Sequence, residues 1–352
     1  MKVAKLYGFN DIRIEDIPIP EIGPKDALIK TKACGICSGD VMPWYIEKKA
    51  PIVLGHEPAG EIVELGREVS ENLKNFWSIG DRVFTHHHAP CFACRFCRRS
   101  DYVQCETWKN TKIIPGGISE YILIPETNLE NDTLKLPENV SFEDGTLIEP
   151  TACVVKGLKR AGLASKKSSL YRSNVLVIGL GVMGQIHIML ALEYGAGKII
   201  GADMIPYRLK KAKEFGADEV IDASRYNLTE ILKEITAGEM ADLVVVGPNS
   251  AEAMEEGISC VGAGGTVLFF TPARMGERLT IDPNYLYFRD INIVTSYSCG
   301  PTDTAEALKL IAEGVVRAEK LVTHRFPIEK TPEAFKLTSQ AHDSLKSIII
   351  FD

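Results

Sequence analysis

Four cysteines lie close together in the sequence, at a spacing that suits a metal ion. Cys91, Cys94, Cys97 and Cys105 follow the pattern C-x2-C-x2-C-x7-C. Four thiolates at this density are typical ligands of a closed tetrahedral zinc site, which stabilises a loop that has no hydrophobic core of its own. The alternatives are disulfide bonds and an iron–sulfur cluster, although the ferredoxin spacing ends in C-x3-C-P, which is absent here. The pattern therefore predicts a structural zinc site.

A second group of candidate metal ligands is scattered along the chain. Cys37 lies in ACGICSGD, His56 and Glu57 lie in GHEPAGEIVELG, and Glu149 lies in LIEP. A thiolate, an imidazole and a carboxylate from separate segments would leave one coordination position open, as a catalytic zinc requires. Taken singly, Cys37 fits a buried structural cysteine, His56 a core histidine and Glu149 an acid at a helix N-terminus. Spacing alone does not bring these residues together.

A glycine-rich motif follows a short β-branched segment in the second half of the chain. In NVLVIGLGVMGQ, the pattern G-x-G-x-x-G falls on Gly179, Gly181 and Gly184, with Val182 and Met183 between the last two. The glycines allow a tight turn, close approach of the backbone to a pyrophosphate, and close packing of a helix on a strand. The pyrophosphate would lie at the positive end of that helix. This motif predicts a dinucleotide site, the alternative being a turn that glycines only shape.

Two charged residues further along bear on which dinucleotide would bind. Asp203 ends the next β segment, near the position from which a carboxylate binds the adenosine ribose hydroxyls. Its charge would repel a 2′-phosphate, which favours NAD over NADP. Arg208 follows closely and could either accept that phosphate or stack on adenine. The alternative for Asp203 is that it only caps the turn.

The pattern of apolar residues predicts two kinds of fold around these motifs. Up to about residue 125 the chain reads as short β segments cut by Gly and Pro, which predicts an irregular β domain. From 143 to 162 the apolar positions follow a helical stripe. Short β-branched runs then alternate with helical segments, as in βαβ units of a doubly wound parallel sheet. The final run SIIIFD is expected to return to the sheet of the first domain, because its apolar side chains need an existing sheet to bury them.

Composition excludes several classes of protein. The chain has 352 residues, which predicts about two domains. Its net charge of −7 argues against binding to nucleic acid, and no apolar run is long enough to span a membrane. The first sixteen residues lack the apolar core of a secretion signal, so a cytoplasmic location is expected, where clustered cysteines are more often metal ligands than disulfides.

The order of these motifs resembles that of the zinc-dependent medium-chain dehydrogenase/reductase family, over essentially the whole chain. The resemblance implies a GroES-like catalytic domain over 1–153 that includes the structural zinc loop, a Rossmann NAD-binding domain over 154–294, and a return to the catalytic domain over 295–352. It also implies two zinc ions per chain, one catalytic and one structural. The motifs that carry it are, in order, CGIC with Asp40, GHEPAGEIVELG, GDRV, the four-cysteine loop, GGISEY, LIEP and VIGLGVMG with Asp203.

The resemblance also assigns roles to single residues. Cys37 and His56 match the first two ligands of the family's catalytic zinc, and Glu57 matches a glutamate that binds or swings toward that metal. Glu149 stands where the primary-alcohol dehydrogenases have a cysteine, and a glutamate there resembles the sorbitol, threonine and sugar dehydrogenase branch. Whether Glu57 or Glu149 is the third ligand stays open. Asp40 matches a carboxylate that orients the histidine ligand.

One departure from the family pattern concerns proton transfer. The family has Ser or Thr two residues after the first cysteine ligand, but this chain has Gly39 there and Ser38 one position earlier. Ser38 is therefore a weaker candidate for the proton relay, with Glu57, Glu149 or a water molecule as alternatives.

The predicted function is oxidation of a small secondary alcohol, of the polyol or sugar-alcohol type, by NAD. The alternatives are an amino-alcohol dehydrogenase of the L-threonine type and a non-enzymatic NAD-binding module. A homo-oligomer, dimer or tetramer, is expected because NYLYFRD resembles the family's segment near a subunit contact. His86, His87 and His88 form a run that is interpreted as a solvated loop, the alternative being a position near the active-site cleft.

Overall fold

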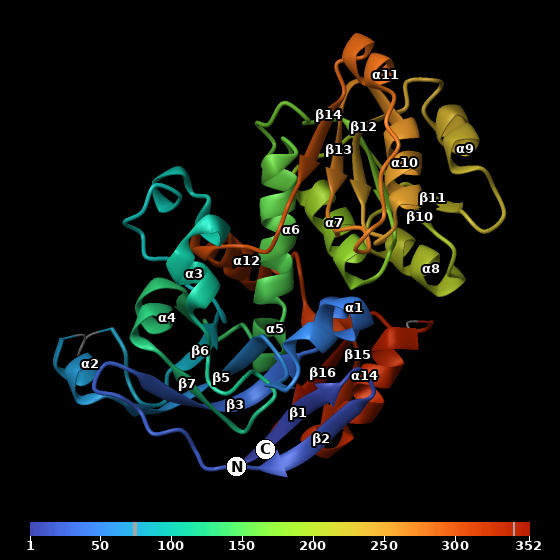
Figure 1. The fold of residues 1–352 in the computed structure, drawn as a ribbon. Helices are drawn as coiled ribbons and strands as arrows, with labels where there is room; N and C mark the ends of the chain where they lie inside the picture. The colour runs from blue at the N-terminus through green and yellow to red at the C-terminus, as the bar shows by residue number, and fades with distance from the viewer. Residues whose placement is uncertain (73–75, 341) are drawn as a thin grey trace. The chain divides into compact units, whose positions relative to one another are not determined.

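The chain leaves its first structural unit once and later returns to it (Figure 1). Unit 1 comprises Met1–Ala152 and Cys299–Asp352, and unit 2 comprises Cys153–Ser298. The computed structural model describes residues 1–72, 76–340 and 342–352. The first crossing between the units lies inside helix α6 (Ile148–Arg160).

Unit 1 is built on β-sheet. Its described residues form a seven-stranded sheet of order β15-β16-β3-β5-β6-β8, with β7 also paired to β3, and a small sheet of order β2-β1-β4. The C-terminal strand β16 pairs antiparallel with β3, Ile349 opposite Cys34, so Ile348 and Ile349 are buried in the sheet of unit 1. The strands are β1 (Lys2–Gly8), β2 (Asp11–Asp16), β3 (Ala27–Gly35), β4 (Ile52–Val53), β5 (Glu57–Leu65), β6 (Arg82–Thr85), β7 (Tyr121–Ile124), β8 (Thr133–Lys135), β15 (Val322–Pro327) and β16 (Lys346–Ile350).

Short helices connect these strands. The helical stretch predicted from residue 143 is two helices, α5 (Phe142–Gly145) and α6. Ser141 caps α5 with a capping box to Asp144, and Pro150 is tolerated in the first turn of α6, where its missing N–H has no intrahelical partner. The other helices of unit 1 are η1 (Ser38–Val41), α1 (Pro43–Ile46), η2 (Glu47–Lys49), α2 (Arg67–Asn72), η3 (Cys97–Arg99), η4 (Tyr102–Gln104), α3 (Glu106–Asn110), α4 (Glu126–Asn131), α12 (Pro301–Ala312), α13 (Ala318–Leu321), η5 (Ile328–Lys330) and α14 (Thr331–Gln340).

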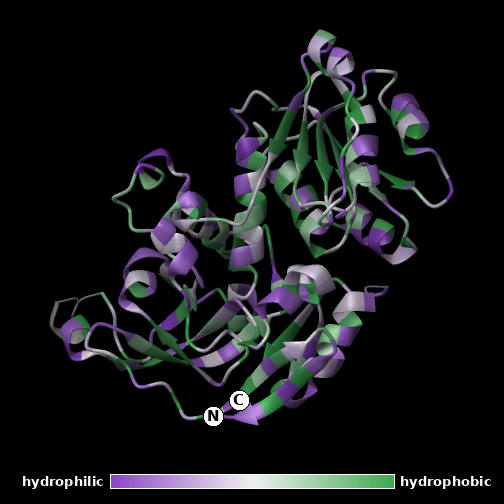
Figure 2. Cartoon of the chain, in the orientation of Figure 1, coloured by the Kyte–Doolittle hydropathy of each residue, from purple (hydrophilic) through white to green (hydrophobic). Residues whose placement is uncertain are grey.

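Unit 2 is a doubly wound α/β fold, as the alternating sequence pattern predicts. All neighbouring strands of its six-stranded sheet, of order β11-β10-β9-β12-β13-β14, are parallel. The strands are hydrophobic in Figure 2, as expected for a sheet covered on both faces. The strands are β9 (Asn174–Ile178), β10 (Lys198–Asp203), β11 (Glu219–Asp222), β12 (Ala241–Val246), β13 (Val261–Phe269) and β14 (Asn292–Thr295).

The strand order of unit 2 fixes where a ligand would bind. The chain builds outward from β9 to β11 and then crosses back to β12 on the other side of β9. Because such crossovers are right-handed, α7 and α8 lie on one face and α9 and α10 on the other. The reversal between β9 and β12 is a topological switch point, where α/β sheets bind ligands at the carboxyl ends of the strands. The helices are α7 (Val182–Glu193), α8 (Pro206–Glu214), α9 (Leu228–Ile235), α10 (Ala251–Ser259) and α11 (Pro283–Phe288).

Over the parts of the chain that the structure describes, no helix combines the length and the apolar character that crossing a bilayer requires.

A buried histidine in unit 2 predicts how stability depends on pH. His187 is 1% exposed, donates from Nδ1 to Met183 O at 2.8 Å and packs edge-on against Phe270. Burial lowers the pKa of His187 to about 4. Between pH 6.5 and 4, His187 is therefore protonated in the unfolded chain but not in the folded chain. The free energy of unfolding falls as the pH falls through this range.

Replacing His187 should remove that pH dependence. At pH 5 the effect is about 2 kcal/mol of unfolding free energy relative to pH 7. We expect His187→Gln to show a correspondingly smaller loss between pH 7 and pH 5 in urea unfolding. Equal losses in both proteins would mean that His187 does not titrate in this way.

Candidate metal centres and dinucleotide site

The four predicted structural cysteines converge in one cluster of unit 1. Their sulfur atoms lie within 4.8 Å of one another, with Cys94 Sγ 3.5 Å from Cys97 Sγ and Cys105 Sγ 3.6 Å from Cys91 Sγ. All four are thiols rather than disulfides. The backbone N–H groups of Ala93 and Cys94 donate to Cys91 and lower its pKa, which favours the thiolate that a metal needs. The cluster fits the tetrahedral thiolate zinc site that the spacing predicts.

Removing one of these thiols should loosen the whole loop. The cluster's own apolar packing is small and consists mainly of Tyr102, Val103 and Trp108 around the cysteines. We expect Cys97→Ser to lower the zinc content by about one ion per chain. Faster proteolytic cleavage within 91–110 should accompany the loss, as seen by mass spectrometry of limited digests. Unchanged zinc content and unchanged digestion would contradict a structural zinc site here.

Three of the predicted catalytic ligands meet at the amino end of β5. One donor atom from each of Cys37, His56 and Glu57 lies within 4.8 Å of the other two. Cys37 caps η1 and accepts a hydrogen bond from Gly39 N at 3.3 Å. His56 and Glu57 lie at the start of β5, which pairs with β3 so that Glu57 is opposite Gly35. A Cβ on Gly35 would overlap Glu57 Oε2, so this close approach requires glycine.

A carboxylate orients the histidine of this set. His56 Nδ1 lies 3.3 Å from Oδ2 of Asp40, which is 5% exposed. Burial lowers the pKa of His56, but the charges of Asp40 and Cys37 outweigh it and hold this pKa well above its usual value. Asp40 thus occupies the position that carboxylates take behind metal-binding histidines.

Glu57 forms a buried ion pair that the sequence analysis missed. Its carboxylate is 1% exposed, and Oε2 lies 2.5 Å from Nζ of Lys346, which also donates to Ile36 O at 2.9 Å. Burial raises the pKa of Glu57, although the charges of Lys346 and His56 oppose the rise. The other oxygen, Oε1, has no hydrogen-bond partner among the described residues. A buried carboxylate with this unmet demand fits a metal ion beside it.

The structure places Glu149 in a different group of donors. Glu149 lies at the start of α6 and is 6% exposed, and its donor atom lies within 4.8 Å of those of His86 and Cys299. Ser38, the weaker candidate for proton transfer, is exposed in η1, whereas Gly39 lies beside Cys37. Glu149 still lies near the first set, because its charge raises the pKa of both Glu57 and Lys346.

Residues 86–88 lie in a loop, as predicted, but the interpretation of this loop as solvated is wrong. His86 is fully buried, and its Nδ1 lies 2.7 Å from Asp132 Oδ2. The ring of His87 lies 4.9 Å from that of His56, and burial holds the pKa of His87 well below its usual value. His88 Nδ1 is 2.7 Å from Thr111 O. A run of polar residues suggests a loop in water, but His86 and His88 are hydrogen-bonded to residues distant in sequence, and His87 packs against His56.

The glycine motif of unit 2 has the geometry of a dinucleotide turn. Gly179 follows β9 with φ +85°, and a Cβ on Gly184 would overlap Gly179 O. Gly181 caps α7, and a Cβ added there would meet no atom within 4 Å. Val182 and Met183 then form the first turn of α7. The backbone of this turn is thus open to a ligand at the positive end of α7.

Asp203 holds this turn together through both of its oxygens. It ends β10 and is 8% exposed, and it accepts from Leu180 N at 2.6 Å and from Ile205 N at 2.9 Å. Arg208 Nη1 lies 3.6 Å from Oδ2. Gln185, which the sequence analysis missed, supports the same turn by donating to Leu180 O at 2.9 Å. The capping role of Asp203 and a role in ribose binding are compatible, because a carboxylate accepts several hydrogen bonds.

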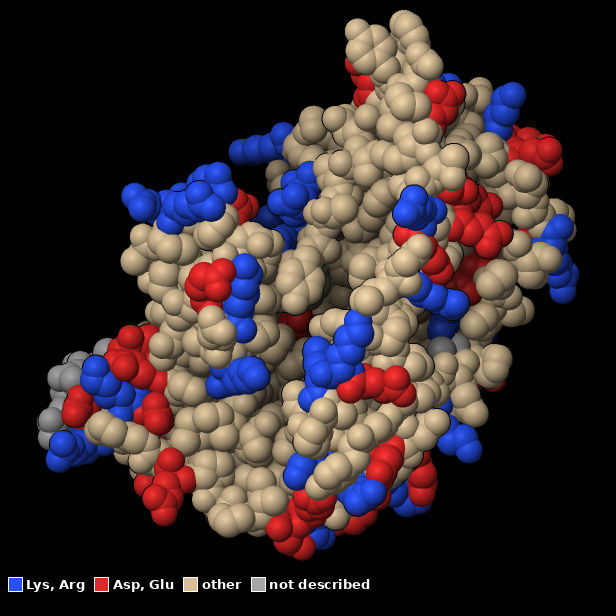
Figure 3. All heavy atoms as spheres, viewed as in Figure 1, with Lys and Arg blue, Asp and Glu red and all other residues tan. Residues whose placement is uncertain are grey.

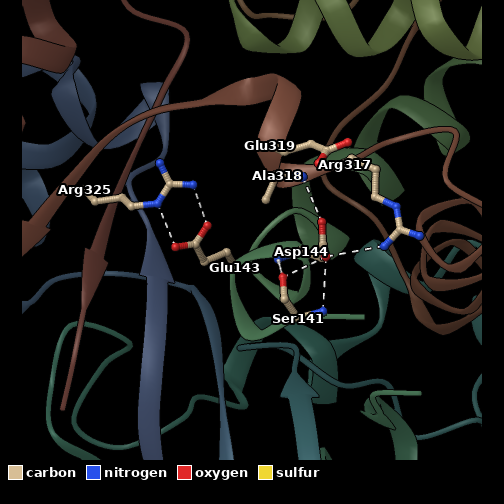
Figure 4. Close-up of a pocket in the computed structure, with 7 residues that line it drawn as sticks. All are labelled: Ser141, Glu143, Asp144, Arg317, Ala318, Glu319 and Arg325. Carbon is tan, nitrogen blue, oxygen red and sulfur yellow. Dashed lines mark hydrogen bonds and ion pairs between the residues drawn. The ribbon is translucent and has the colours of Figure 1, made fainter. Parts of the chain in front are cut away.

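Figures 3 and 4 show the charged residues of one face and a polar hollow of unit 1. Charges of both signs lie side by side on the face shown in Figure 3. Figure 4 shows a polar hollow of unit 1 in which Arg325 pairs with Glu143 at 2.6 Å and Arg317 lies 3.5 Å from Asp144. Its cations are already paired with acids, and none of the predicted site residues lines it.

Comparison with known proteins finds family models and relatives that match most of the chain. The family model of the alcohol dehydrogenase GroES-like domain matches residues 23–138, and that of zinc-binding dehydrogenase matches 182–313. Sorbitol dehydrogenase of Bombyx mori is 32% identical over 347 residues, 95% of this chain and 94% of that protein. L-threonine 3-dehydrogenase of Rhizobium etli is 30% identical and covers 92% and 90%. The solved structure of alcohol dehydrogenase TADH from Thermus sp. ATN1 is 25% identical, with a TM-score of 0.84 over 99% of each chain.

Proposed function

Because the chain belongs to the zinc-dependent medium-chain dehydrogenase family, we propose that it oxidises a secondary hydroxyl of a polyol or sugar alcohol and transfers the hydride to NAD. The observation that carries the proposal is the mixed donor set of Cys37, His56 and Glu57 in a chain that also folds a dinucleotide turn. A protein that only binds NAD has no need of such a set. The sorbitol dehydrogenase relatives support polyols as the substrate class.

Residues of unit 1 would bind the metal directly or orient the residues that bind it. Bound zinc supplies a Lewis acid that makes a substrate hydroxyl more acidic, and NAD supplies the hydride acceptor. Cys37 provides a thiolate and His56 an imidazole nitrogen. Asp40 holds the proton on His56 Nδ1, which leaves Nε2 for the metal. Glu57 provides the third donor, and Lys346 favours its ionised form against the effect of burial.

Substrate class is tested by NAD reduction with the purified chain. The panel comprises sorbitol and other polyols, simple secondary alcohols, and L-threonine, since an L-threonine 3-dehydrogenase is also among the relatives. We expect the highest kcat/KM with a polyol. Preference for L-threonine would move the assignment to the amino-alcohol branch, and no turnover on any member would favour the binding-module alternative.

Preference for NAD is tested at Asp203. The change Asp203→Asn keeps an oxygen for Leu180 N but removes the charge that would face a 2′-phosphate. We expect the preference for NAD over NADP, as a ratio of kcat/KM, to fall about tenfold, which corresponds to about 1.4 kcal/mol. Asp242→Asn makes the same change near the start of β12, where Asp242 accepts from Asn174 N, and should leave the ratio unchanged. Equal ratios in all three proteins would exclude Asp203 from cofactor choice.

Assembly and location complete the proposal. Tyr287 and Phe288 of α11 are 77% and 79% exposed, and we assign this apolar tip to a contact between copies of the chain in a dimer or tetramer. The thiol cluster at 91–105 suits the reducing conditions of the cytoplasm.

A further inference from the structure

A lysine without an acidic partner lies beside the donor set of Cys37, His56 and Glu57. Lys49, in η2, is exposed and forms no ion pair with an acid among the described residues. Its Nζ lies 3.9 Å from the centre of the Tyr45 ring, a cation–π contact that favours this position of the charge. We propose that Lys49 binds an anionic group of the substrate, so that the preferred substrate is a polyol that carries a phosphate or a carboxylate. This inference rests on the proposed function and narrows its substrate class.

Tyr45 connects the charge of Lys49 to the first metal ligand. A Cβ on Gly39 would lie 3.5 Å from Cys37 Sγ and 3.9 Å from Tyr45 Cε1, so Gly39 lies between the thiol and the ring. Helix α1, which carries Tyr45, packs against both η1 and η2. The contacts from Cys37 to Lys49 thus span one glycine and one aromatic ring, a path that a molecule of polyol size can bridge.

The charge of Lys49 also acts on residues around the metal ligands. Burial raises the pKa of Asp40, but the charge of His56, with a contribution from Lys49, holds it below its usual value. Burial is the main cause of the low pKa of His87, and the charge of Lys49 adds to it. Because Coulomb interactions weaken with distance, these effects agree with an ammonium group close to the donor set.

Two buried nitrogen atoms in the same region lack a hydrogen-bond partner among the described residues. One is Nε1 of Trp44, whose ring packs edge-on against Tyr45 with the ring centres 5.9 Å apart. The other is Nδ1 of His87, whose ring lies 4.9 Å from that of His56. Buried polar atoms are normally hydrogen-bonded, so an unpaired one points to a ligand or a water molecule. The indole N–H only donates, which suits an anionic oxygen, and the imidazole nitrogen suits a hydroxyl.

A charged group on the substrate explains the unpaired lysine better than a neutral hydroxyl does. Lys346, the other lysine beside the donor set, is already paired with Glu57. An ammonium group has three N–H donors and no acceptor, and its hydrogen bonds to carboxylate or phosphate are about twice as strong as neutral ones. Lys49 therefore favours substrates that bring their own negative charge.

Binding to the full-length chain tests this preference without depending on turnover. Zinc-loaded protein is mixed with NADH, which prevents oxidation of an alcohol, and is titrated in a calorimeter with D-sorbitol, D-sorbitol 6-phosphate and D-gluconate. We expect at least one of the two anions to bind about tenfold more tightly than sorbitol. The more tightly bound anion identifies phosphate or carboxylate as the recognised group. Lys49→Gln should reduce the preference to about twofold or less, with little change in the affinity for sorbitol.

Two further variants separate the charge of Lys49 from its surroundings. Lys49→Arg keeps a cation and should keep most of the preference, whereas Lys48→Gln removes the neighbouring exposed charge and should leave the preference unchanged. Equal affinities for sorbitol and both anions, or a preference that Lys49→Gln leaves intact, would overturn the proposal. Tighter binding of an anion that is lost in Lys49→Gln supports the proposal even without turnover, and the absence of turnover would then count against the proposed function alone.

Discussion

The variant Cys37→Ala is expected to lose nearly all turnover while keeping its fold. Removing the thiolate leaves only His56 and Glu57 of the first donor set, too few to hold a zinc ion firmly. Metal ions contribute several kcal/mol to transition-state stabilisation, and about 1.4 kcal/mol is a factor of ten in rate. We therefore expect kcat/KM on the best polyol to fall by at least about 10³-fold.

The control for this variant removes a cysteine elsewhere. Cys260→Ala lies in unit 2 and should keep kcat/KM within a factor of about three. Circular dichroism and the zinc content of the four-cysteine cluster should be the same in both variants. If Cys37→Ala retained the activity of the unmodified chain, the donor set would not serve catalysis.

The variant Lys346→Met is expected to be the most destabilising single change. It removes the only cation paired with Glu57 within the described residues and leaves that carboxylate buried. Breaking a buried ion pair in this way costs about 3–5 kcal/mol, because the remaining charge has lost its partner. The variant also loses the hydrogen bond from Nζ to Ile36 O. Urea unfolding of samples with equal zinc content measures the loss.

A second substitution separates the charge from the packing. Glu57→Gln in the Lys346→Met background removes the unpaired charge, so the double variant should recover most of the lost stability. Lys2 and Glu329 form an exposed ion pair in the same unit, and Lys2→Met should leave the stability nearly unchanged, because solvent screens exposed ion pairs. A loss for Lys346→Met as small as that of Lys2→Met would show that the buried pair does not stabilise the fold.

The fold could be predicted from the sequence where the signal is local. The alternation of β-branched runs with helical segments predicts the parallel sheet of unit 2, because each strand and helix carries its own period. One local detail was missed. Pro150, the third residue of α6, cannot donate to the carbonyl four residues earlier, so α5 and α6 are separate helices.

The sites could likewise be predicted only where their residues are close together in the sequence. Four cysteines in one loop and three glycines in one turn are defined by short spacings, so the sequence suffices to predict them. The set of Cys37, His56 and Glu57 came from family resemblance, because a pairing of β3 with β5 brings its members together. Lys346 could have been noticed as a lysine at the head of an apolar strand, but its partner is long-range.

The same limit explains the error at residues 86–88. A run of three histidines is polar and follows a strand, which locally favours a loop in water. Burial of His86 depends on Asp132 and Cys299, and the latter lies more than two hundred residues away in the chain. Such contacts leave no periodic trace in the sequence.

The most direct test is metal-dependent formation of NADH from sorbitol by the full-length chain. A chelator first removes the metal bound outside the four-cysteine cluster, and Zn²⁺ is then added back in steps while NADH absorbance is followed. Our account predicts no turnover in the depleted protein and recovery in proportion to the zinc bound, with no recovery in Cys37→Ala. Full turnover in the depleted protein, or recovery in Cys37→Ala equal to that of the unmodified chain, would contradict it.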